Sequence, residues 1–97
     1  MDHLENINQE ISYVVQENIS YELVENSYII LNLNNGKFYE LNNSSSFIWG
    51  LTSKKNSLKK IIENTKEHFS ISDDKVSEIL SIIDKFEHLE LIQKIEN

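Results

Sequence analysis

Cysteine, proline and arginine are absent from this chain of 97 residues, and only two glycines occur. The lack of cysteine excludes a disulfide framework, a thiolate zinc site and a cysteine nucleophile, and it is typical of a cytoplasmic protein. Because every cation is a lysine, a nucleic-acid-reading surface built on guanidinium groups is excluded. The scarcity of glycine and proline also excludes a glycine-rich phosphate loop and proline-rich ligand segments.

The length and the charge indicate one small acidic domain. Nine lysines against 16 acidic residues give a net charge of −7, which opposes binding to the phosphates of nucleic acids. Residues 1–6 lack the basic and apolar regions of a secretory signal. No stretch approaches the roughly 18 apolar residues of a membrane span. We therefore expect no nucleic-acid partner, no membrane contact and a single core, since chains of this size rarely form two.

The first half of the chain predicts a small antiparallel sheet. Residues 1–18 are mostly polar and predict a loosely ordered arm, which leaves residues 19–97 as the domain. Three runs rich in β-branched and aromatic residues, 19–25, 28–33 and 37–41, predict consecutive strands. Asn35-Gly36 predicts a type I′ turn between the last two runs, because both central residues of that turn need positive φ.

The second half predicts three helices. The first begins near Asn43, Ser57 caps the second, and the third begins at Ser72 and runs to about Leu89. Residues 91–95 are either a final strand or a frayed extension of the third helix. Three strands followed by three helices predict an α+β domain with the helices on one side of the sheet.

The third helix has an unusually wide apolar surface. At about 100° per residue its core stripe is widened on one flank by Ile82 and Leu89, and Lys75 and Glu78 border that flank. The flank resembles the wall of a groove, although Ile82 and Leu89 could instead pack under the first helix or the arm. The core stripe comprises Val76, Ile79, Leu80, Ile83 and Phe86.

The run 37–41 is expected to lie at an edge of the sheet, where backbone N–H and C=O groups have no partner. A free edge beside an apolar helix flank favours binding of an extended peptide by strand addition. A winged helix that binds DNA is the main competitor on architecture. The third helix argues against it, because its acidic residues outnumber its lysines.

No catalytic residue, metal site or cofactor site is predicted. The histidines His3, His68 and His88 are scattered over the arm and two helices without metal-ligand spacing. The serines 44–46 are explained by helix capping. The adjacent acids Asp73 and Asp74 cannot converge on one bond as a general acid and base, because successive helix residues point in different directions.

Two segments carry a family resemblance. Residues 30–42, with the sequence ILNLNNGKFYELN, resemble the "LL...G..Y.LN" signature of PqqD-like proteins, which are also called precursor-peptide recognition elements of ribosomally synthesised, post-translationally modified peptides. Together with Phe47-Ile48-Trp49, which follows a few residues later, this segment looks most similar to that of stand-alone family members from lasso-peptide pathways. Residues 78–92 resemble the closing sequence pattern of the family. Glu90 replaces the usual glycine, so we expect a slightly longer third helix, and Glu78 replaces the usual aspartate.

The resemblance implies a winged-helix-like fold and a non-catalytic function. A leader peptide would add as a strand along the third strand and lie against the third helix, and the protein would present it to a maturation enzyme such as a leader protease, a cyclase or a radical enzyme. The alternative is a structural or regulatory module that uses the same groove for self-association or enzyme docking. A monomer and a homodimer, in which the arm covers the free edge, both stay open. The implied walls are Lys37, Phe38, Tyr39, Glu40 and Leu41 on the strand, and Lys75, Glu78, Ile79, Ile82 and Phe86 on the helix.

Overall fold

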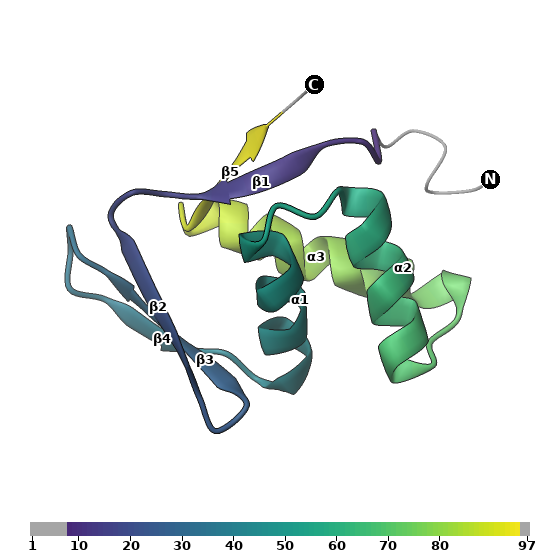
Figure 1. Ribbon diagram of the computed structural model, residues 1–97, viewed down its shortest axis with the longest axis horizontal. Coiled ribbons are helices and arrows are strands. Elements are labelled where there is room, and N and C mark those ends of the chain that lie inside the picture. Colours follow the sequence, from purple (N-terminus) through teal and green to yellow (C-terminus); the bar gives the residue numbers. More distant parts are fainter. Residues whose placement is uncertain (1–7, 96–97) are drawn as a thin grey trace.

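The computed structural model describes residues 8–95 and confirms an α+β fold in which a three-stranded antiparallel sheet precedes three helices (Figure 1). A second, two-stranded sheet joins the two ends of the described chain. The helices lie to one side of the three-stranded sheet, and α1 is the nearest to it (Figure 1). In chain order the elements are β1 Ser12–Val15, β2 Ile19–Val24, β3 Ser27–Asn32, β4 Phe38–Glu40, α1 Asn43–Ser53, α2 Leu58–Phe69, a 3-10 turn Asp73–Lys75, α3 Val76–His88 and β5 Ile92–Ile95.

The two hairpins of the three-stranded sheet have turns of different lengths, and the second turn differs from the one predicted. Glu25 and Asn26, with φ of 49° and 71°, form the two-residue type I′ turn between β2 and β3. The prediction of a type I′ turn at Asn35-Gly36 is wrong, because only Gly36 of that pair has a positive φ, of 76°. The side chains of Asn32 and Asn35 accept hydrogen bonds from the backbone two residues later, at 2.9 Å each, and so stabilise a longer loop.

The second sheet changes the expected boundary of the arm. β1 pairs antiparallel with β5, and Ile11 and Tyr13 are buried in the core. Burial, together with the nearby Glu87 and Asp84 carboxylates, raises the pKa of Tyr13 to about 12. Residues 11–15 therefore belong to the folded domain, whereas residues 1–7 of the predicted arm lie outside the described residues. The tail is a strand, and within residues 8–95 β1 pairs with β5 of its own chain and not with β4.

The core lies between the three helices and the two sheets. Trp49 of α1 is fully buried, and its ring meets Phe86 of α3 edge-on with a centroid distance of 5.2 Å. The predicted stripe of α3 is confirmed, since four of its five residues are 2% exposed and Leu80 is partly buried. Asn42 and Ser57 cap α1 and α2 through their side-chain oxygens, as the sequence predicts for Ser57.

The carboxyl end of α3 is closed by a Schellman motif. The N–H of Leu91 donates to the C=O of Phe86, and the N–H of Glu90 donates to the C=O of Glu87, both at 2.9 Å. This arrangement puts Glu90 in the left-handed region at φ 61°. The expected lengthening of the helix is therefore wrong: the helix ends at His88, and Glu90 adopts the conformation that a glycine would adopt without strain.

Replacing Glu90 by glycine should stabilise the protein. Glycine removes the steric cost of positive φ, and we expect a gain of about 0.5–1 kcal/mol in the free energy of unfolding, measured by urea denaturation. Glu90→Ala is the matched control, because alanine keeps the strained Cβ and should give no gain. Equal stabilities of the glycine and alanine variants would contradict this account of the helix end.

Candidate functional site

The three-stranded sheet has two outer strands, β2 and β4, and within residues 8–95 each of them pairs only with β3. In β4 the alternation of an antiparallel ladder directs the backbone groups of Tyr39 toward β3 and those of Phe38 and Glu40 away from it. The flanking bonds agree with this phase: the C=O of Lys37 accepts from the N–H of Asn32, and the N–H of Leu41 donates to the C=O of Tyr28. The free edge of β4 is thus formed by the N–H and C=O groups of Phe38 and Glu40.

The side chains of β4 point to two different sides of the sheet. Tyr39 and Leu41 are partly buried and pack against the core. Phe38 and Glu40 point to the other side, where Phe38 is 69% exposed and lies opposite Leu31 in the register. A peptide at the free edge would therefore meet backbone along the whole strand, with the core-facing side chains on one side and Phe38 and Glu40 on the other.

A serine from α1 fixes the end of β4. The hydroxyl of Ser46 donates to the C=O of Leu41 at 3.1 Å and accepts from the N–H of Tyr28 at 3.0 Å. Leu41 and Tyr28 already share one backbone hydrogen bond, of 2.9 Å. Ser46, which is 4% exposed, supplies the bridge that completes this pair and ties the edge strand to the first helix.

A cavity of about 440 Å³ adjoins the wide flank of α3. Of the residues predicted on the helix wall, Lys75, Glu78, Ile79 and Ile82 all line it, and the Lys75 ammonium and Glu78 carboxylate approach to 3.7 Å at its rim. The partly buried Ile82 shares the cavity with Ile48 of α1. The flank therefore faces a hollow toward the first helix.

Phe86 and five further residues depart from the predicted set. Phe86 is 2% exposed and packs against Trp49, so its ring belongs to the core and does not line the cavity. Sequence reasoning missed the part of the lining that comes from α1, α2 and the segment after α2, because helix periodicity shows which face is apolar and not which neighbours surround it. These missed residues are Ser44, Ile48, Thr65, Phe69 and Ile71.

The composition of the cavity suits an apolar side chain. Isoleucine and phenylalanine side chains dominate its lining. The Thr65 hydroxyl donates a hydrogen bond of 2.6 Å to the C=O of Ile61, within its own helix.

No cluster of three potential metal ligands occurs among residues 8–95. Over the same residues, no helix combines the length and the apolar character needed to cross a membrane.

Comparisons with known proteins agree with the observed fold. The sequence model of the family described as "Coenzyme PQQ synthesis protein D (PqqD)" matches residues 27–92. The solved structure of TbiB1 in complex with the TbiA(beta) leader peptide has a similar fold, with a TM-score of 0.76 and 16% identity, covering 81% of this chain and 93% of that chain. A search among curated proteins finds no match.

Replacing Ser46 by alanine should loosen the edge strand. The change leaves the buried N–H of Tyr28 without its partner, and we expect a loss of about 1–3 kcal/mol in the free energy of unfolding. Amide hydrogen exchange should also speed up in β4 more than in α2. Ser45→Ala is the control, since the Ser45 side chain makes no hydrogen bond within the described part of the chain. A Ser46→Ala protein as stable as this control would show that the bridge is unimportant.

Proposed function

The chain belongs to the PqqD family, and from this we propose that it is a non-catalytic leader-peptide recognition protein in the biosynthesis of a ribosomally synthesised, post-translationally modified peptide. The leader would bind as a fourth strand on β4 and reach α3. The observation that carries this proposal is the free backbone edge at Phe38 and Glu40, in a domain with an apolar cavity beside the wide flank of α3.

Strand addition uses the backbone for affinity and the side chains for selection. Two N–H and two C=O groups of β4 would pair with the leader whatever its sequence. Selection would come from the cavity, which is lined by Ile48, Ile79 and Ile82 and fits a large apolar side chain of the leader. We expect an extended segment held in this way to reach sub-micromolar dissociation constants, which correspond to about −8 to −10 kcal/mol.

The position of the cavity in the chain supports the same reading. Ser44, which lines it, follows closely after the end of β4 at Glu40, because the strand leads directly into α1 (Figure 1). A leader that leaves the edge strand near Glu40 would continue toward this cavity and the Lys75–Glu78 pair at its rim. The fold similarity to TbiB1, which was solved with a leader peptide, supports binding of a leader by this fold.

The role of such a protein is to raise the local concentration of the precursor at a maturation enzyme. The enzyme would be a leader protease, a cyclase or a radical enzyme, and the recognition protein would supply binding and orientation without chemistry of its own.

Glu40→Pro tests the backbone edge. Proline removes the outward N–H of residue 40, so the affinity for the leader should fall about tenfold, the effect of one lost hydrogen bond. Fluorescence anisotropy with a labelled candidate leader peptide measures the affinity. Glu40→Ala is the matched control, because it removes the carboxylate and keeps the N–H. Equal affinities of the proline and alanine variants, with unchanged helicity, would move the leader away from this edge.

Ile82→Asp tests the apolar flank. A buried carboxylate in the cavity opposes entry of an apolar side chain, and we expect at least a tenfold loss of leader affinity in the same assay. Ser77→Asp adds the same charge to an exposed position of α3 away from the cavity and should bind normally. Normal binding by a folded Ile82→Asp protein would place the site elsewhere.

A further inference from the structure

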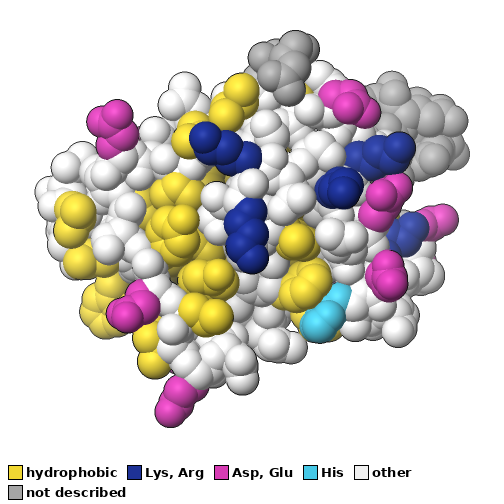
Figure 2. Space-filling model, in the orientation of Figure 1, with side chains coloured by type: hydrophobic (Ala, Val, Ile, Leu, Met, Phe, Trp, Pro, Cys, Tyr) yellow, Lys and Arg dark blue, Asp and Glu magenta, His cyan; other side chains and the backbone are white. Residues whose placement is uncertain are grey.

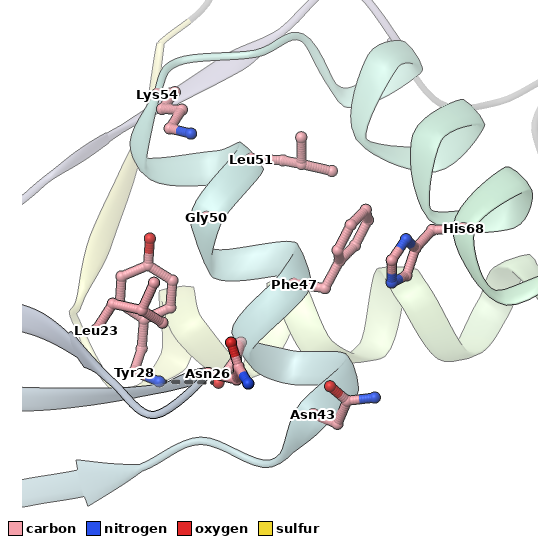
Figure 3. A pocket seen from close by; sticks show the side chains of 10 residues that line it. Leu23, Asn26, Tyr28, Asn43, Phe47, Gly50, Leu51, Lys54 and His68 are labelled. Atoms are coloured by element: carbon pink, nitrogen blue, oxygen red, sulfur yellow. Dashed lines mark hydrogen bonds between the residues drawn. The ribbon is translucent and has the colours of Figure 1, made fainter.

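A second concave region lies on a different face of α1 (Figure 3). Its volume is about 450 Å³, and it is bounded by the β2–β3 hairpin, α1 and α2. Leu23 and Tyr28 come from the hairpin, Phe47, Gly50 and Lys54 come from α1, and His68 comes from α2 (Figure 3). We call this region the hairpin groove.

The first helix separates the hairpin groove from the cavity beside α3. Phe47, Gly50 and Lys54 are three and four residues apart and so share one face of α1. Ser44 and Ile48, which line the other cavity, lie on a neighbouring face of the same helix. A partner in the hairpin groove would therefore leave the proposed leader site open.

The hairpin groove has an apolar floor. Gly50 has no side chain there, and a Cβ built on it would lie 3.6 Å from the ring of Tyr28. On one side Leu23 is 55% exposed, and on the other the rings of Phe47 and His68 stack with centroids 4.1 Å apart. Figure 2 shows hydrophobic side chains gathered on both sides of a lysine in the middle of this face of the molecule.

The charge of the hairpin groove is opposite to that of the whole protein. The chain carries a net charge of −7, yet no carboxylate lines this groove, and its basic residues are Lys54 and His68. Carboxylates of this acidic protein would repel an acidic partner. Because none of them lines the hairpin groove, the groove is suited to a partner that carries carboxylates. Large apolar residues around a central cation are also typical of interaction surfaces.

We propose that the hairpin groove docks the maturation enzyme, through an exposed segment in which a leucine or phenylalanine lies beside aspartate or glutamate. The apolar side chain sits over Gly50 between Tyr28 and Phe47, and the carboxylate meets the ammonium of Lys54. This proposal rests on the proposed function. It adds that one protein holds leader and enzyme at the same time, on two faces separated by α1.

Two variants test the proposal with a purified candidate maturation enzyme, such as a leader protease, by biolayer interferometry on the full chain. Lys54→Glu reverses the charge of the groove, and Gly50→Leu fills its floor with a side chain. Each should weaken enzyme binding at least tenfold and leave leader affinity within twofold of the original. Lys59→Glu makes the same charge change on exposed α2 and Gly50→Ala adds one methyl group at ordinary contact distance, so both should bind the enzyme normally.

The results separate this proposal from the function on which it rests. If the unaltered protein does not bind a leader peptide, the proposed function itself is overturned. Enzyme binding that is unchanged in both Lys54→Glu and Gly50→Leu, or is never detected, would overturn only the docking site. Conversion of a dimer to a monomer by Lys54→Glu in analytical ultracentrifugation would also overturn it, by showing that a second copy fills the groove.

Discussion

The hydrogen bonds of Ser46 hold the edge strand in a position where one side of it stays free. A strand that is to receive a peptide must be fixed well enough to present its N–H and C=O groups in register, and it must still lack a second neighbour. β3 supplies the single neighbour, and Ser46 ties the last residue pair, Tyr28 and Leu41, to α1. The outward groups of Phe38 and Glu40 are ordered as a consequence, without being used.

The first helix, α1, also positions α3 and lines both the cavity and the hairpin groove. Trp49 packs against Phe86 and so sets the position of α3, while Ile48 and Ser44 form one side of the cavity next to it. The neighbouring face, with Gly50 in the middle, lines the hairpin groove. One short helix thus contributes to the edge strand, the cavity and the groove, which explains how a small domain can present two separate concave surfaces.

Local features of the sequence predicted most of the fold. The strand meander, the helix cap at Ser57 and the core stripe of α3 depend on neighbouring residues, and the structure has all of them. The pairing of β1 with β5 was missed because it joins distant segments that carry little periodic signal of their own. Helix periodicity predicts Phe86 in the core stripe, and only the family resemblance implies it in the groove wall; its packing against Trp49 agrees with the periodicity.

Amide hydrogen exchange of the labelled protein, with and without the precursor leader, tests the added strand most directly. The outward N–H groups of Phe38 and Glu40 should become protected when the leader binds, while the N–H of Tyr39 keeps its protection from β3. β2 has an equivalent free edge at Tyr21 and Leu23. Protection at Tyr21 and Leu23, with Phe38 and Glu40 still exchanging freely, would contradict the account.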